Sequence, residues 1–85
     1  MKEYNGHRSW NAWNVSLWIN NNYGLYQSCV DILRSLQKKY PALPIERIEE
    51  KAASILAKDF AGVRTPDGAK YNRLAIREAI REMIT

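Results

Sequence analysis

The segment WNAWNVSLWINNNYGLY, residues 10–26, constrains the fold of this chain more than any other, because it holds all three tryptophans. Its apolar residues repeat at helical spacing and cover two sides of one helix. The two sides are formed by Trp10, Trp13 and Leu17 and by Val15, Trp18 and Ile19. A helix that is apolar on two sides is buried or contacts a partner. We therefore expect the tryptophans to anchor a core, with the alternative that Trp10 stays partly exposed as a binding residue.

Both ends of this first helix are marked in the sequence. Ser9 or Asn11 can serve as the N-cap, because a short side-chain oxygen accepts a hydrogen bond from a backbone N–H that has no helical partner. The asparagines at 20–22 compete with the backbone for hydrogen bonds, and Gly24 tolerates positive φ. The helix is predicted to end at Gly24.

The N-terminal third of the chain carries a signature with fixed aromatic spacing. It consists of Tyr4-Asn5-Gly6, Trp13-Asn14-Val15, Leu17-Trp18-Ile19 and Gly24-Leu25-Tyr26. It resembles a family of small proteins, without a settled biochemical function, that bacteriophages, archaeal viruses and related mobile elements encode. Ala12 stands where that signature usually has Thr, and His7 where it often has Trp. The resemblance implies a viral or mobile-element origin and no particular activity.

Apolar periodicity predicts three more helices in the rest of the chain. Pro41 ends the second helix, Pro44 opens the third, and Asn72 caps the fourth, which covers residues 73–84. The expected core residues of the three helices are, in order, Leu25, Cys29, Ile32, Leu33, Leu36 and Tyr40; Ile45, Ile48, Ala52, Ile55, Leu56 and Phe60; and Leu74, Ile76, Ala79, Ile80, Met83 and Ile84.

The expected fold class is all-α, a compact four-helix domain. Gly62 is predicted to end the third helix, and Pro66-Asp67-Gly68 then gives a strong turn signal. The segment before the fourth helix is therefore either a short β-hairpin or a plain loop. The 85 residues, 46% hydrophobic and 26% charged, have the size and composition of one globular domain over residues 1–85.

Composition also bears on location and redox state. No apolar run approaches the roughly 18 residues that cross a bilayer, and the N-terminus has no signal-peptide core, so we expect a cytoplasmic protein without a membrane partner. Cys29 is the only cysteine, which excludes an internal disulfide. Its position on the apolar stripe indicates a core residue rather than a reactive thiol.

No constellation of residues typical of an active site is present in the sequence. His7 is the only histidine, and no glycine-rich phosphate loop, Cys-x-x-Cys pair or His-x-x-x-His pair occurs. Glu46, Glu49 and Glu50 cluster at the start of the third helix, where the macrodipole favours acidic groups, and are expected to form a solvated helix start. We therefore predict no enzymatic activity, no metal and no cofactor.

Arg73, Arg77 and Arg81 recur every fourth residue and so share one face of the last helix. They form either a solvated face, partly neutralised by Glu78 and Glu82, or a stripe that binds phosphates or an acidic protein. The formal net charge of +4 and the pI of about 9.4 permit both interpretations.

Two functions from different classes fit these features. The first is a protein-binding module that a mobile element uses against a host protein or ribonucleoprotein complex, such as an inhibitor of a nuclease or a CRISPR-type defence. Its expected partner-binding residues are Tyr4, Trp10, Tyr23, Tyr26, Arg73, Arg77 and Arg81. The second is a small nucleic-acid-binding regulator that uses the three arginines, although the short proline-containing connector does not suit a helix-turn-helix. A homodimer through the apolar first helix is compatible with either.

Overall fold

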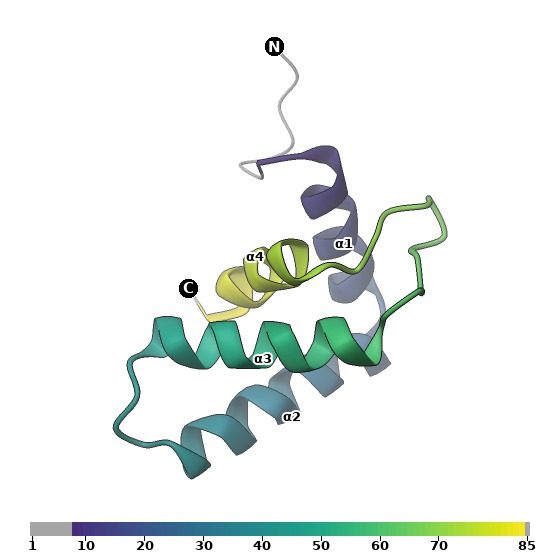
Figure 1. Ribbon diagram of the computed structural model, residues 1–85. Helices are drawn as coiled ribbons and strands as arrows, with labels where there is room; N and C mark the ends of the chain where they lie inside the picture. Colours follow the sequence, from purple (N-terminus) through teal and green to yellow (C-terminus); the bar gives the residue numbers. More distant parts are fainter. Residues whose placement is uncertain (1–7, 85) are drawn as a thin grey trace.

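Four α-helices account for nearly all the regular structure in residues 8–84, the part of the chain that the computed structural model describes (Figure 1). The helices are α1 (Trp10–Asn21), α2 (Tyr23–Lys39), α3 (Ile45–Asp59) and α4 (Arg73–Ile84). Helix α4 packs against both α1 and α3, and α2 packs against α3 and α1. The prediction of an all-α four-helix domain is confirmed.

The caps of the helices follow the short polar residues in the sequence. Ser9 caps α1, its Oγ accepting from the backbone N–H of Ala12 at 3.1 Å. Asn72 caps α4 in the predicted way, its Oδ1 accepting from the N–H of Ala75 at 2.9 Å. Each cap satisfies one of the donors that a helix start leaves without an intrahelical partner.

The boundary between α1 and α2 differs from the prediction. Helix α1 ends at Asn21, and Asn22 is both its C-cap and the N-cap of α2, with its Oδ1 accepting from the N–H of Leu25 at 3.1 Å. Gly24 therefore lies in the first turn of α2 and does not end a helix. A Cβ at position 24 would lie 3.3 Å from Asn22 Oδ1, so the glycine leaves room for the capping side chain.

The core side of α1 is also different from the one expected. The buried apolar residues of this helix are Ala12, Val15 and Ile19, whereas Trp13 and Trp18 are half-buried and Trp10 is 40% exposed. Small and branched side chains form the buried side of α1, which packs against α4 and α2. The expectation that the tryptophans anchor the core is wrong.

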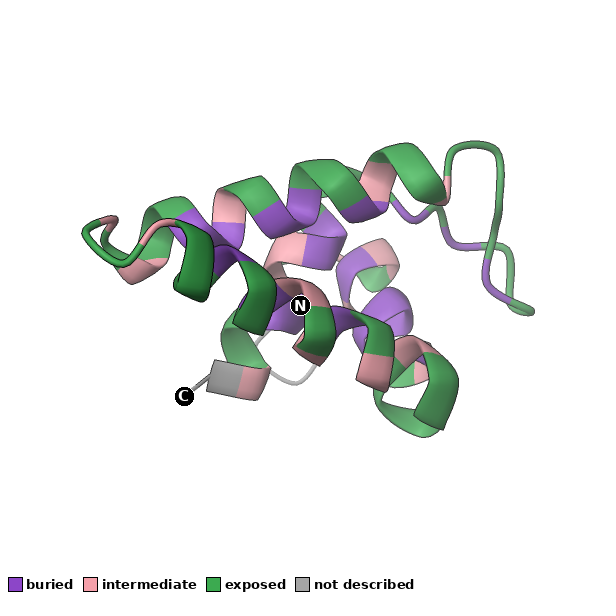
Figure 2. Cartoon of the chain, turned by 90° about the horizontal axis from the view of Figure 1, so that it is seen from below, coloured by how far each residue is buried: buried purple, intermediate pink, exposed green. Residues whose placement is uncertain are grey.

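In the other helices half of the residues predicted for the core are buried, and six more pack against it partly buried (Figure 2). The buried core residues of α2, α3 and α4 include Cys29, Leu33, Leu36, Ile48, Ala52, Leu56, Ile76, Ala79 and Ile80. Two predicted core residues are instead exposed, Ile55 by 41% and Leu74 by 52%. Both lie at the edge of an apolar stripe wider than the neighbouring helices can cover.

The segment between α3 and α4 makes a tight turn rather than a strand pair. Arg64 and Lys70 form one isolated antiparallel bridge, and the N–H of Thr65 donates to the carbonyl of Ala69 at 2.9 Å. Gly68 has φ 96°, a left-handed conformation that glycine adopts without steric cost. The two predicted alternatives were a short β-hairpin and a plain loop, and the segment is a loop that contains one isolated β-bridge.

Helix α1 holds this turn through polar side chains. Asn14, only 1% exposed, donates from Nδ2 to the Asp67 carboxylate at 2.9 Å and accepts from the Thr65 hydroxyl at 2.6 Å. The Trp18 indole N–H donates to the same Asp67 oxygen at 2.8 Å. These contacts fix the turn on α1, and through it the chain that leads into α4.

Asn11 completes this arrangement one helical turn earlier. Its Oδ1 accepts from the backbone N–H of Lys70 at 2.7 Å and its Nδ2 donates to the Lys70 carbonyl at 2.9 Å. A side-chain amide carries both an acceptor and a donor, so it can bond the N–H and the C=O of one residue as a neighbouring β-strand would. Asn11 therefore binds the loop before α4 and is not the N-cap of α1. None of the described helices is both long and apolar enough to cross a membrane.

Candidate binding surface

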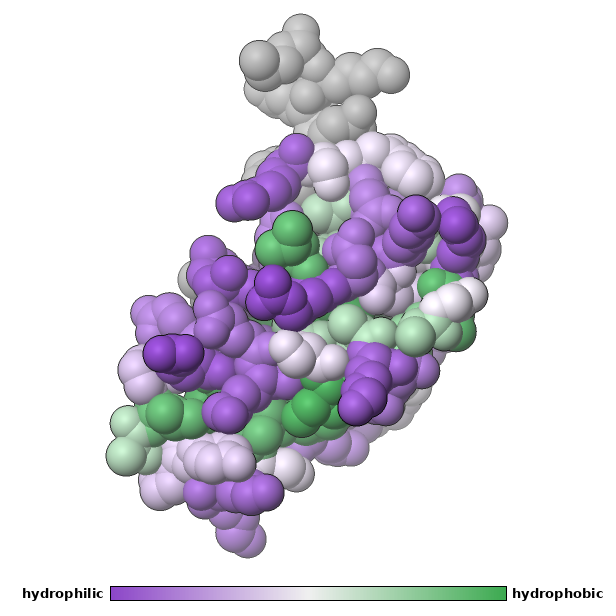
Figure 3. All heavy atoms as spheres, in the orientation of Figure 1, coloured by the Kyte–Doolittle hydropathy of each residue, from purple (hydrophilic) through white to green (hydrophobic). Residues whose placement is uncertain are grey.

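Cationic side chains gather on the side of the molecule formed by the outer faces of α3 and α4, which we call the basic face. They line two neighbouring hollows and come from four parts of the chain: Arg8, Lys39, Arg47, Lys51, Arg73, Arg77 and Arg81. Among residues 8–84, two carboxylates line the same hollows, those of Glu50 and Glu78. The view in Figure 3 shows hydrophilic side chains over much of α3 and α4, with hydrophobic ones among them.

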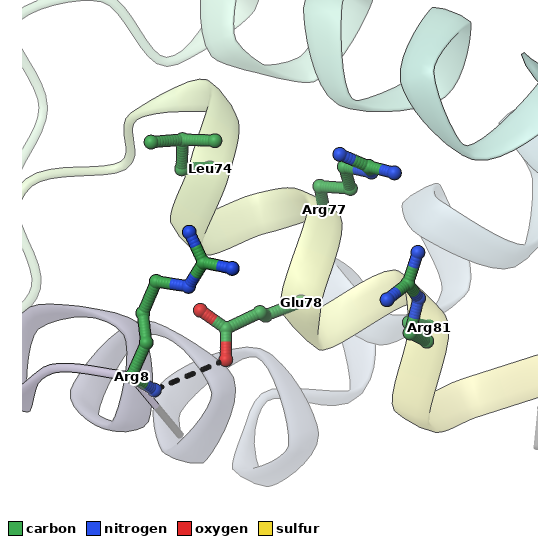
Figure 4. Close-up of a pocket in the computed structure, with 5 residues that line it drawn as sticks. All are labelled: Arg8, Leu74, Arg77, Glu78 and Arg81. Atoms are coloured by element: carbon green, nitrogen blue, oxygen red, sulfur yellow. Dashed lines mark hydrogen bonds between the residues drawn. The ribbon is translucent and has the colours of Figure 1, made fainter. Parts of the chain in front are cut away.

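The smaller hollow, of about 60 Å³, is lined by Arg8, Leu74, Arg77, Glu78 and Arg81 (Figure 4). The backbone N–H of Arg8 donates to Glu78 Oε1 at 3.4 Å, which joins the segment before α1 to the middle of α4. Figure 4 shows the Glu78 carboxylate turned toward Arg8 and the Arg77 side chain extending toward α3. The hollow is thus a small cationic depression with one apolar wall, Leu74.

Two carboxylates of α3 lie close to arginines of α4. Arg81 Nε lies 3.5 Å from Glu49 Oε1, and Arg77 lies 3.9 Å from Glu50 Oε1. Glu49 is buried, so the prediction that Glu46, Glu49 and Glu50 form a solvated helix start is wrong for this residue. Its Oε1 and the Nε of Arg77 are buried without a hydrogen-bond partner among the described residues. Both separations exceed the usual N–H···O hydrogen-bond distance.

The larger hollow is an open groove of about 520 Å³, formed by the end of α2, the outer face of α3 and the first residue of α4. Its lining residues are Leu36, Lys39, Tyr40, Arg47, Glu50, Lys51, Ser54, Ile55 and Arg73. The ammonium groups of Lys39 and Lys51 lie 5.5 and 4.9 Å from the centre of the Tyr40 ring, within the range of cation–π attraction. Glu50 lines this groove and pairs with Arg77, which lines the smaller hollow, so the two hollows adjoin.

The three predicted arginines line two different hollows. Arg77 and Arg81 line the smaller hollow, whereas Arg73 lines the groove. Within residues 8–84 Arg73 forms no ion pair. Glu82 accepts a hydrogen bond from Ser16 of α1 at 2.9 Å, and Glu78 accepts one from the backbone N–H of Arg8 at 3.4 Å.

The predicted aromatic residues do not form a common patch. Trp10 is 40% exposed at the start of α1, and Tyr23 and Tyr26 are 79% and 37% exposed at the start of α2. Helix α1 has 12 residues, so at a rise of about 1.5 Å per residue its two ends lie about 18 Å apart. Tyr4 lies outside the described residues, as does His7.

Several residues of the basic face were missed by sequence reasoning. Arg47 and Lys51 are spaced i and i+4 on α3, a signal equal to that of the α4 arginines, and could have been found in the same way. Arg8 could not, because it reaches the face through a contact with Glu78, 70 residues away in the chain.

The metal-ligating and thiol side chains form no second site in the described part of the chain. No group of three or more His, Cys, Asp or Glu side chains there is placed to hold a metal ion. Cys29 is fully buried, and desolvation raises the pKa of its thiol to about 11, which keeps it protonated at neutral pH and fits the predicted core role. Thr65 and Asp67 both bond to Asn14 of α1, so that cluster is structural.

Comparison with known proteins places the chain in a family. No curated protein and no solved structure matches it. The model of one family, described as a family of unknown function (DUF7249), matches residues 1–85, and the chain therefore belongs to that family.

Proposed function

We propose that this is a small non-enzymatic binding protein whose basic face contacts an acidic surface of another protein. The observation that carries the proposal is the exposure of Leu74 and Ile55 among cationic side chains of the two adjoining hollows. Protein interfaces combine apolar anchors with arginine and tyrosine and have a polar rim. The basic face has each of these components.

The carboxylates of the face favour a protein over a nucleic acid as the partner. Glu50 and Glu78 line the hollows and would repel phosphates at close range. An acidic protein surface can avoid these two positions, because its carboxylates occur at separate places, whereas a phosphate backbone carries one charge per nucleotide. Steric block by a small rigid domain is a sufficient mode of action.

An origin in a virus or mobile element, and a host defence complex as the target, form part of the same proposal. They are supported by the resemblance of the signature around Trp13-Asn14-Val15 to proteins of such elements. The small size of the chain suits an inhibitor that covers a partner's working surface.

The test is capture of a host protein from a bacterial or archaeal lysate by the tagged full chain. The lysate is divided into nuclease-treated and untreated halves. Leu74→Gln is expected to reduce capture at least about fivefold, the factor for a loss of about 1 kcal/mol at an anchor residue. Gln is a good helix former, so the fold is expected to survive.

Val63→Gln is the matched control, because Val63 is 50% exposed and lines neither hollow of the basic face. A protein captured equally by the wild type and Leu74→Gln would contradict the proposal. Loss of capture by both Leu74→Gln and the control Val63→Gln would also contradict the proposal.

A second candidate, a small nucleic-acid-binding regulator, is favoured by the lining of the two hollows, where the described residues include seven cationic and two acidic side chains. It predicts that binding falls by about 0.9 log units per log unit of salt for each phosphate contacted on duplex DNA. Arg77→Glu would then weaken binding to every sequence equally. Partners that vanish from the capture after nuclease treatment would favour this candidate.

A further inference from the structure

We infer that the groove at the end of α2 accepts a short acidic segment of the partner protein that carries one large apolar side chain. This inference rests on the proposed function and names the chemistry that one part of the basic face would recognise. The groove has a volume of about 520 Å³. Cavities that hold compact ligands measure roughly 300 to roughly 1000 Å³, so the groove has a suitable size.

The apolar part of the groove sets the first requirement on its occupant. Leu36, Tyr40 and Ile55 line it from two helices, and Ile55 is 41% exposed although it belongs to the apolar side of α3. Covering exposed apolar surface contributes about 25 cal/mol per Å². A leucine or phenylalanine side chain in the ligand would cover this surface.

The charges of the groove set the second requirement. Lys39, Arg47, Lys51 and Arg73 line it against the single carboxylate of Glu50. Glu50 lies 3.9 Å from Arg47, and the two side chains are 40% and 69% exposed, so their pair is weak and open to exchange. Arg47 and Lys51 are one turn apart, about 6 Å along α3. Two carboxylates at that spacing, on one side of an extended or helical peptide, would meet both cations.

Tyr40 distinguishes an acidic peptide from a nucleic acid. A single-stranded nucleic acid binds by stacking its bases on exposed aromatic rings. The ammonium groups of Lys39 and Lys51 already lie within 5.5 Å of the Tyr40 ring centre, on the surface that a base would need. A carboxylate can instead approach these ammonium groups while they remain over the ring.

The experiment is an NMR titration of the ¹⁵N-labelled full chain with a synthetic peptide of about ten residues. The peptide contains several glutamates and one leucine. A second peptide with every glutamate replaced by glutamine, and a single-stranded oligonucleotide, are titrated in parallel. The expected result is a set of chemical-shift changes confined to the groove, at residues 36–40, 47–55 and 73, for the acidic peptide alone.

Charge reversal identifies the groove as the site. The double variant Arg47→Glu/Lys51→Glu is expected to raise the Kd for the acidic peptide at least about tenfold, with the unfolding free energy measured for each protein. Lys58→Glu is the matched control, because Lys58 is exposed on the same helix and does not line the groove. It is expected to change the Kd by less than about twofold.

Equal binding of the glutamine peptide, shift changes outside the groove, or tighter binding of the oligonucleotide would each overturn the inference. So would equal effects of the double variant and Lys58→Glu. These failures leave the proposed function testable, because the capture experiment depends on Leu74, which lines the smaller hollow and not the groove.

Discussion

Asn14 is the buried polar residue that joins helix α1 to the turn before α4. Its amide bonds Thr65 and Asp67, more than 50 residues away, and its side chain is almost fully buried. A buried amide with both ends satisfied specifies one arrangement of the groups around it. The asparagine of the Trp-Asn-Val signature thus has a structural role in positioning the turn before α4.

Replacing Asn14 with Ala is expected to lower the free energy of unfolding by about 2 kcal/mol, because the buried Thr65 hydroxyl loses its acceptor. Urea denaturation followed by tryptophan fluorescence measures this change. Asn21→Ala is the control, because Asn21 is exposed on the same helix. This control substitution is expected to cost less than about 0.5 kcal/mol. Equal effects of the two substitutions would show that the network does not stabilise the fold.

Asp67 makes the same network sensitive to acid. Hydrogen bonds lower the pKa of the Asp67 carboxyl below the ordinary value of 3.8, the larger effect coming from Asn14 and the smaller from Trp18. Both bonds favour the charged form of the carboxyl. Because the folded pKa is depressed, the stabilisation is complete above the unfolded pKa and is lost as the pH falls through the folded pKa.

The melting temperature of the wild type is therefore expected to exceed that of Asp67→Asn at about pH 6, and the difference is expected to shrink toward about pH 2. Asp59→Asn controls for the loss of one negative charge at an exposed position. A difference between wild type and Asp67→Asn that stays constant over this range would contradict the assigned role.

At the scale of the elements, the junction of α1 and α2 depends on one residue. Asn22 ends α1 in an extended conformation and caps α2, so no separate loop joins the two helices. The direction of α2 relative to α1 is therefore set by the backbone of Asn22 and by its bond to Leu25.

Asn22→Ala is expected to destabilise the protein by about 1 kcal/mol, the usual cost of losing a side-chain cap. Asn22→Ser, which keeps a hydroxyl acceptor, is expected to remain close to the wild type. Thermal unfolding followed by the far-ultraviolet circular dichroism of the helices compares the three proteins. If Ser proves as costly as Ala, capping is not the reason for the asparagine.

At the scale of the whole molecule, features set by local sequence were predictable. The number of helices, the cap Asn72 and the buried side of α2 depend on residues a few positions apart and were predicted correctly, and Ser9 was one of the two caps predicted for α1. The end of α1 was predicted at Gly24, whereas α1 ends at Asn21 and Gly24 lies inside α2, because Asn22 rather than the glycine separates the two helices.

Features set by distant contacts could not be read from the sequence. Both sides of α1 are apolar, and only the packing of α4 decides that Val15 and Ile19 are buried while Trp10 is left exposed. Likewise Leu74 belongs to an apolar stripe, but no neighbouring helix covers it. The split of the arginine stripe between two hollows depends on Arg8 and on α3, neither of which is near α4 in the chain.

The central claim, that the basic face and not the exposed aromatic residues binds the partner, is tested most directly by two variants. The Kd of a captured and purified partner is measured for Arg73→Glu and for Tyr23→Ala, with unfolding free energies as a check on folding. The claim predicts a Kd raised at least about tenfold for Arg73→Glu and changed by less than about twofold for Tyr23→Ala. Loss of binding by Tyr23→Ala, with Arg73→Glu still binding like the wild type, would contradict it.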